Sequence, residues 1–115
     1  MICSHKGAPR LSATLGHLAV QGAPAGLGWE VLVIDNASTN DTAAVARGAW
    51  PSAAPAPLRI VVEPRLGLGH ARARGLTEAR YEVVSFVDDD KLGRAGLDRD
   101  GFGRHARAGA WRLWW

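Results

Sequence analysis

The sequence lacks the features that identify several large classes of protein. It has one cysteine, Cys3, so an internal disulfide is excluded and a zinc site has no second thiolate to build on. No stretch approaches the roughly 20 apolar residues of a membrane-spanning helix, and residues 1–6 lack the apolar core of a signal peptide. At 115 residues the chain has the length of one small domain. We therefore expect a single-domain cytoplasmic protein without a transmembrane segment.

The last part of the sequence also lacks β-branched aliphatic residues, since no valine or isoleucine follows Val87. The charge changes at nearly the same point. Residues 1–90 hold eight Lys and Arg against nine Asp and Glu, whereas residues 91–115 hold six against two. The net charge of +3 and the pI near 9.8 therefore come from the end of the chain. We expect a folded domain over residues 1–90 and an irregular basic tail, rich in Gly, Arg and Trp, over residues 91–115.

A basic tail with aromatic residues has an alternative interpretation, which is binding to nucleic acid or to a membrane surface by charge and stacking. Its glycines and irregular spacing disfavour an amphipathic helix, and the rest of the chain is nearly neutral. We therefore expect no nucleic-acid partner.

Hydrophobic periodicity before residue 90 alternates between the two kinds of secondary structure. Continuous aliphatic and β-branched runs predict buried parallel strands, and apolar residues at helical spacing predict helices between them. The expected strands are 29–35, 58–63 and 82–87, preceded by the incomplete run 1–3, and the expected helices are 9–21, 43–50 and 67–80. The order βαβαβαβ predicts an α/β fold, a Rossmann-like three-layer sandwich with about four mainly parallel strands.

Three consecutive carboxylates, Asp88 to Asp90, follow the last predicted strand. Like charges this close repel one another unless a cation neutralises them, and an oxygen-only cluster suits Mg²⁺ or Mn²⁺. The alternative is a solvated acidic loop. We favour a metal site because parallel sheets bind ligands at the carboxyl ends of their strands.

The ordered motifs of residues 2 to 90 together resemble those of the family 2 inverting glycosyltransferases. They are I-C-S-H-K at 2–6, W-E-V-L-V-I-D-N-A-S-T at 29–39, the segment 67–75 with A-R-A-R-G, and F-V-D-D-D at 86–90. The resemblance implies the nucleotide-sugar-binding part of a GT-A fold. It also implies metal-dependent transfer of a sugar from a nucleoside-diphosphate sugar to an unknown acceptor.

The resemblance assigns roles to the acidic residues in particular. Asp90 is the expected metal ligand, and Asp88 and Asp89 are expected to contact the metal or the ribose. Asp35 matches the carboxylate that recognises the base or ribose of the nucleotide.

Four further residues complete the expected nucleotide-sugar site. Ser4 and His5 match strand-end positions that line the pocket, with turn or capping roles as the alternative. Arg65 and Arg72 are candidates for the diphosphate, since Arg binds phosphate well, with a solvated helix surface as the alternative.

The chain departs from the family pattern at three places. Ala73 replaces the usual Asn of the A-R-N element, Lys91 replaces the Asn that commonly follows the acidic motif, and nothing after Lys91 resembles the family. The acceptor half and its general base are missing, so we expect no turnover from this fragment. The alternatives are a non-catalytic nucleotide-binding protein and an inert gene remnant.

A single inserted base explains the change at Lys91. Permitted GC-rich codons for residues 91–99 spell Asn-Trp-Val-Ala-Pro-Gly-Trp-Ile, a family-like segment, once one base is removed from the first codon. We therefore expect a truncated chain whose reading frame shifts after residue 90.

Overall fold

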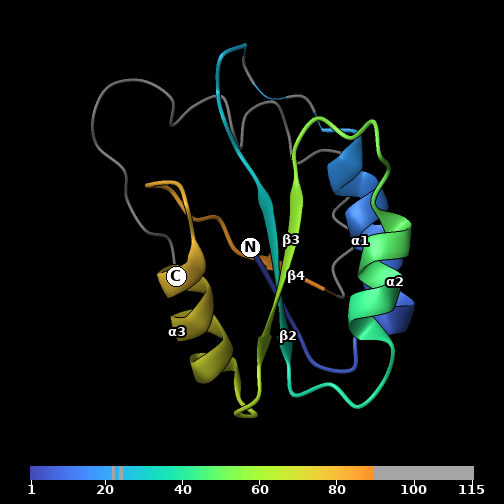
Figure 1. Ribbon diagram of the computed structural model, residues 1–115, viewed down its shortest axis with the longest axis vertical. Coiled ribbons are helices and arrows are strands. Elements are labelled where there is room, and N and C mark those ends of the chain that lie inside the picture. Colours follow the sequence, from blue (N-terminus) through green and yellow to red (C-terminus); the bar gives the residue numbers. More distant parts are fainter. Residues whose placement is uncertain (22, 24, 90–115) are drawn as a thin grey trace.

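The computed structural model of the protein describes residues 1–21, 23 and 25–89, and Figure 1 shows their arrangement. Helices and strands alternate along the chain, as the sequence predicts. In order they are β1 (Ile2–Ser4), α1 (Ala8–Ala19), β2 (Val31–Asn36), α2 (Thr42–Ala49), β3 (Leu58–Glu63), α3 (Leu68–Glu78) and β4 (Val87–Asp88). The predicted tail lies outside the described residues.

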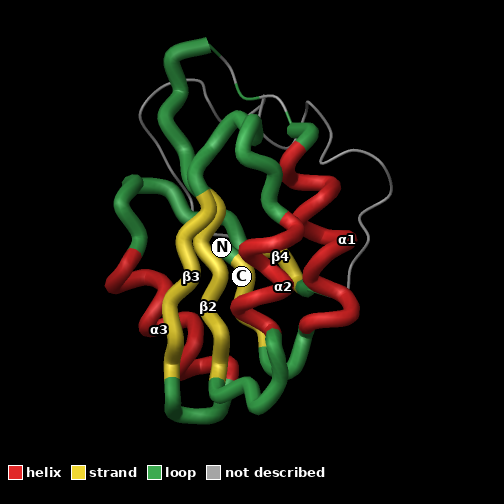
Figure 2. Tube along the Cα trace, turned by 45° about the vertical axis from the view of Figure 1, so that its right-hand side comes forward, coloured by secondary structure: helices red, strands yellow, loops and turns green. Residues whose placement is uncertain are grey.

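The four strands form one parallel sheet in the order β3-β2-β1-β4. Helices α1 and α2 cover one face of the sheet and α3 covers the other (Figures 1 and 2). The chain runs from β1 outward to β3 and then crosses back over β1 to β4, so right-handed crossovers place α3 opposite the first two helices. The expected α/β class and its four parallel strands are confirmed.

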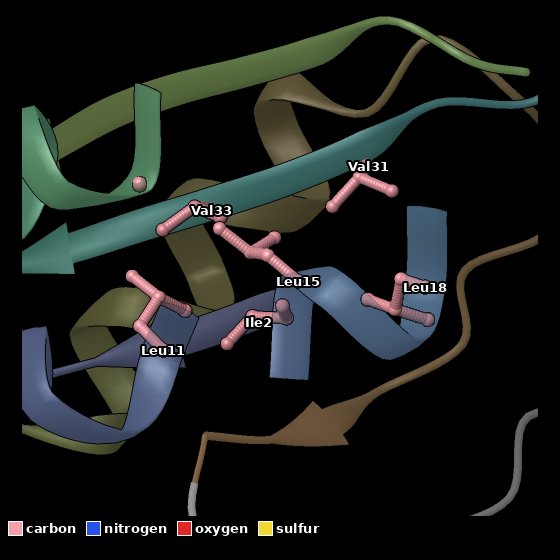
Figure 3. Close-up of a cluster of buried hydrophobic side chains, with 7 residues drawn as sticks. Ile2, Leu11, Leu15, Leu18, Val31 and Val33 are labelled. Atoms are coloured by element: carbon pink, nitrogen blue, oxygen red, sulfur yellow. The ribbon is translucent and has the colours of Figure 1, made fainter. Parts of the chain in front are cut away.

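Strand β2 is buried along its whole length, because helices cover both faces of the sheet there. Alternate residues of β1 and β2 join helix α1 in one apolar cluster, which Figure 3 shows in close-up. That cluster contains Ile2, Leu11, Leu15, Leu18, Val31, Val33 and Ala46. The other face is smaller and consists of Leu32, Ile34 and Ala71 with partly buried neighbours.

Helix α3 approaches the sheet closely at Gly75. A Cβ atom at this position would lie 1.8 Å from Sδ of Met1 and 3.2 Å from Cγ1 of Ile34. The absence of a side chain at Gly75 therefore lets the helix pack directly on β1 and β2. This close contact explains why the last residue of the A-R-A-R-G segment is a glycine.

Strand β4 is shorter than predicted, since only Val87 of the expected strand 82–87 lies in it. Its neighbour in the sheet, β1, is itself only three residues long. The amide of Val87 donates to the carbonyl of Met1, and the terminal amino group of Met1 donates to the carbonyl of Ser85. Residues before Ser85 have no β1 backbone to pair with, so their β-branched composition does not produce a ladder.

An ion-pair cluster ties the amino end of the sheet together. Nη1 of Arg59 lies 3.1 Å from both carboxylate oxygens of Glu30, and Nη2 lies 3.3 Å from Oε2 of Glu78. The amide of Arg80 also donates to Glu30, at 3.2 Å. Arg74 pairs with Glu78 on the outer surface of α3, at 3.0 Å. The cluster joins β2, β3 and the end of α3.

Candidate functional site

The carboxyl ends of the strands meet at one edge of the sheet, where the loops after β2 and β3 lie at the bottom of Figure 1. The direction of strand order reverses between β1 and β4, and open parallel sheets bind ligands at such a switch point. Ser4 pairs in register with Asp35, and Cys3 with Asp88. The polar residues predicted from sequence are therefore neighbours across three strands.

Strand alternation divides these residues between the two faces of the sheet. Ile2 and Val87 pack with the α1 cluster, so Ser4 lies on that face and Asp88 on the opposite, α3 face. Ile34 packs on the α3 face, which places Asp35 with Ser4 on the α1 face.

Asp89, which follows β4, contacts helix α1 and the loop before it. Its Oδ2 accepts a 2.7 Å hydrogen bond from the Ser4 hydroxyl and lies 3.5 Å from Nη2 of Arg10. Its carbonyl accepts a hydrogen bond from the Thr14 hydroxyl at 3.2 Å. A Cβ atom at Gly7 would lie 2.4 Å from the same Oδ2. Ser4 and Asp89 were both expected to face the nucleotide, and in the structure they bind each other.

Asp35 is 7% exposed, and its Oδ1 has no hydrogen-bond partner. Burying an unpaired carboxylate oxygen is unfavourable, and such atoms are rare in folded proteins. A ligand N–H or O–H would satisfy this oxygen. The position fits the predicted role of Asp35 as a hydrogen-bond acceptor for a nucleoside.

His5 and Asn36 form the link between the loops after β1 and β3. Nδ1 of His5 lies 2.7 Å from the carbonyl of Asn36, and since a carbonyl only accepts, His5 donates from Nδ1. The Asn36 side chain donates to the carbonyls of Glu63 and Arg65 and accepts from the amide of Gly67. These bonds fix the start of α3 against the ends of β1 and β2.

A hollow of about 170 Å³ lies beside this link, on the α3 side of the sheet edge. Cys3, Ser4 and His5 form one wall, Asn36 lies between, and the start of α3 forms the other wall. The second wall consists of Leu66, Gly67, Leu68 and Ala71. Of the polar strand-end residues, Ser4, His5 and Asn36 line the hollow, whereas Asp35 and Asp88 are not among its lining residues.

Arg72, which lies on α3, packs against Phe86 in the segment just before β4. Its guanidinium carbon lies 5.3 Å from the centre of the Phe86 ring, and its Nε is buried without a hydrogen-bond partner. Burial raises the pKa of the Cys3 thiol, an effect that the positive charges of the amino terminus and Arg72 oppose. Arg72 is therefore near β1, and its contact with a diphosphate stays a prediction.

Arg65 binds a carboxylate of the protein itself. Its Nε lies 2.8 Å and its backbone amide 2.9 Å from Oε1 of Glu63, a side chain that is almost completely buried. These hydrogen bonds lower the pKa of Glu63 from 4.5 to about 2. The pairing fixes the loop between β3 and α3, and a diphosphate contact from Arg65 remains a prediction as well.

The metal prediction concerns Asp88 and Asp90, of which Asp90 lies outside the described residues. Among residues 1–21, 23 and 25–89 no group of three His, Cys, Asp or Glu side chains is arranged to hold a metal ion. Mg²⁺ and Mn²⁺ are often bound by one or two protein carboxylates together with substrate phosphates. Asp88 is exposed at the end of β4, and its role as one of these carboxylates stays a prediction.

Sequence reasoning did not identify Gly7, Arg10, Asn36 and Glu63 as parts of this edge. Asn36 and Glu63 are polar residues that end aliphatic runs, the same signal that identified Asp35, so the pattern was available. Gly7 and Arg10 act through contacts with Asp89 that are distant in sequence, and nothing local indicates them.

A three-layer parallel sheet with carboxylates at the carboxyl ends of its strands is typical of the nucleotide-binding α/β class. Comparison with known proteins narrows this class: residues 1–92 match the model of glycosyl transferase family 2. The chain therefore belongs to this family. The resemblance drawn from the motifs is confirmed for the N-terminal part.

Curated relatives agree with this assignment. The chain is 41% identical over 71 residues to uncharacterized glycosyltransferases of Mycobacterium bovis and of two strains of Mycobacterium tuberculosis. The match covers 60% of this chain and 28% of each relative, so the chain spans less than a third of the length of the curated relatives it matches. No solved structure matches the chain.

The described helices do not meet the requirements of a membrane-spanning helix. None of them combines the length and the apolar composition needed to cross a bilayer. The cytoplasmic location expected from the sequence stays a prediction.

Proposed function

We propose that this chain is the donor-binding part of an inverting glycosyltransferase. It binds a nucleoside-diphosphate sugar together with Mg²⁺ or Mn²⁺, for transfer of the sugar to an unknown acceptor. Family membership supports the class of reaction. The observation that carries the binding role is the buried, unpaired Oδ1 of Asp35 beside the other polar strand ends.

Different residues at this edge of the sheet bind different parts of the donor molecule. Asp35 accepts a hydrogen bond from the base or the ribose, because its buried oxygen needs a donor. His5, held through Nδ1, presents the rest of its ring near the hollow. Arg72 supplies positive charge on the α3 side, where a diphosphate would lie close to Asp88.

Asp88 and Asp90 would hold the metal ion, which stabilises the negative charge that develops on the departing nucleoside diphosphate. The oxygen-only chemistry of these side chains suits Mg²⁺ or Mn²⁺. Asp88 lies in β4, next to β1, so a metal held there would be near the hollow.

The described residues provide no acceptor-side carboxylate to which we can assign the role of a general base. We therefore propose that the chain binds the donor without turning it over. An inert remnant is the competing interpretation, and it predicts no specific nucleotide binding at all.

A variant of Asp35 separates these interpretations. Asp35→Ala should abolish the heat of UDP binding in the presence of Mn²⁺, while the unfolding temperature stays equal to or above that of the wild type, because an unpaired buried carboxylate oxygen is removed. Asp41→Ala is the matched control, since Asp41 is exposed and makes no side-chain cap bond to α2. Equal heats for wild type and Asp35→Ala would refute the assignment.

A further inference from the structure

We propose that Asp89 is a positioning residue that locks the end of β4 to helix α1, and that it is not a ligand of the metal or the nucleotide. The inference rests on the proposed function, because the group that Asp89 positions is Asp88. It assigns separate roles to two neighbouring carboxylates of one acidic motif.

The contacts of Asp89 already satisfy its charge. The carboxylate is 15% exposed and accepts a 2.7 Å hydrogen bond from the Ser4 hydroxyl, with Nη2 of Arg10 at 3.5 Å. Both partners belong to the β1–α1 segment, and a third residue of that segment, Thr14, binds the Asp89 carbonyl. An anion at the start of a helix also interacts favourably with the helix dipole. A carboxylate held in this way has little need of a further cation.

The space for this carboxylate depends on Gly7. A Cβ atom there would lie 1.9 Å from the Ser4 Oγ and 2.4 Å from the Asp89 Oδ2, both far inside van der Waals contact. The Ser4 hydroxyl and the Asp89 carboxylate therefore both lie against the backbone of Gly7. The loop after β1 is shaped to receive Asp89.

The contacts of Asp89 also orient the side chain of Asp88. Val87 packs with the α1 cluster and Asp89 binds α1, so the intervening side chain points to the α3 face, in register with Cys3. Fixing Asp89 thus fixes the direction of Asp88. Loss of the lock should weaken metal-dependent binding through Asp88 without removing any ligand.

The test is a double-mutant cycle on the full chain with Ser4→Ala, Asp89→Ala and the double variant. Ser12→Ala is the matched control on the exposed side of α1. Each single variant should lower the unfolding temperature by about 4–8 °C, and the double variant should be no lower than Asp89→Ala alone, because both substitutions remove the same Ser4–Asp89 hydrogen bond. Mn²⁺-dependent UDP affinity should fall about 10–100-fold in all three, as for residues that orient a ligand, whereas the Ser12→Ala control should bind UDP as the wild type does.

Three results would overturn the inference. Additive losses of unfolding temperature would mean that Ser4 and Asp89 act independently. Complete loss of Mn²⁺-dependent binding in Asp89→Ala, with Ser4→Ala unaffected, would make Asp89 a direct ligand. Absence of Mn²⁺-dependent UDP binding in the wild type would refute the proposed function, and with it the role of Asp88, even where the thermal coupling is present.

Discussion

Arg59 offers a quantitative test of what holds the amino end of the sheet together. Its guanidinium is 20% exposed and its partner Glu30 only 6% exposed, so the pair lies largely out of water. Arg59→Met removes the cation, both of its bonds to Glu30 and its bonds to Glu78, while Glu30 keeps the hydrogen bond from the Arg80 amide. The variant therefore leaves the buried carboxylate of Glu30 without its guanidinium partner.

The expected loss follows from this arrangement. Breaking a buried ion pair by removing one partner destabilises a protein by about 3–5 kcal/mol, because the other charge is left uncompensated. Partial exposure of Arg59 places the expected value near the lower limit, at about 3 kcal/mol. The double variant Arg59→Met with Glu30→Leu should be more stable than Arg59→Met alone, since it also removes the stranded charge.

The assay is urea unfolding at neutral pH, with the free energy of unfolding obtained by linear extrapolation. Arg74→Met is the control, because it removes only the exposed i,i+4 pair with Glu78, a contact that contributes about 0.3–0.5 kcal/mol. Equal effects of Arg59→Met and Arg74→Met would show that burial of the Glu30 pair does not determine its energy, and would refute the reasoning.

Three further predictions concern the rest of the chain. Gly7→Ala should destabilise the protein by about 1–3 kcal/mol through overpacking against Ser4 and Asp89. Gly16→Ala, in open space on helix α1, should instead stabilise it by about 0.5–1 kcal/mol, and thermal unfolding of both variants checks this. Because Arg65 lowers the pKa of Glu63 from 4.5 to about 2, this contribution to stability is complete above pH 4.5 and disappears toward pH 2, so the difference in unfolding temperature between wild type and Glu63→Gln should shrink over that range. Sequencing the gene should reveal one extra base near the codon for Lys91, and a genomic sequence in which no single-base change restores a family-like frame would contradict the frame-shift proposal.

Much of the fold could be predicted from sequence because the strands are buried on both faces. Continuous runs such as 58–63 identified the strands, and the expected helix 67–80 lies within two residues of the observed α3 at each end. The exception is the segment 82–87, whose composition favours a strand. A strand also needs a neighbouring strand to pair with, and on this side the short strand β1 pairs only with Val87 and Asp88.

The candidate site was predicted less completely, because its contacts join residues distant in sequence. The placement of Asp35 and Asp88 at one edge of a parallel sheet could be predicted because both follow aliphatic runs, whereas their roles in binding stay predictions. The binding of Ser4 to Asp89 was not foreseen, since it depends on the position of α1 and on the space at Gly7. Similarly, the sequence alone does not show that Arg65 pairs with the buried side chain of Glu63.

In the proposed function, carboxylates at the end of β4 hold a divalent ion against the diphosphate of a nucleotide. Calorimetry of UDP binding with and without Mn²⁺ tests it directly, on the wild type, Asp88→Ala and Asp90→Ala. The account predicts a saturable heat for the wild type that requires Mn²⁺ and is lost in both variants. A heat that is independent of Mn²⁺, or one that survives both substitutions, would contradict it.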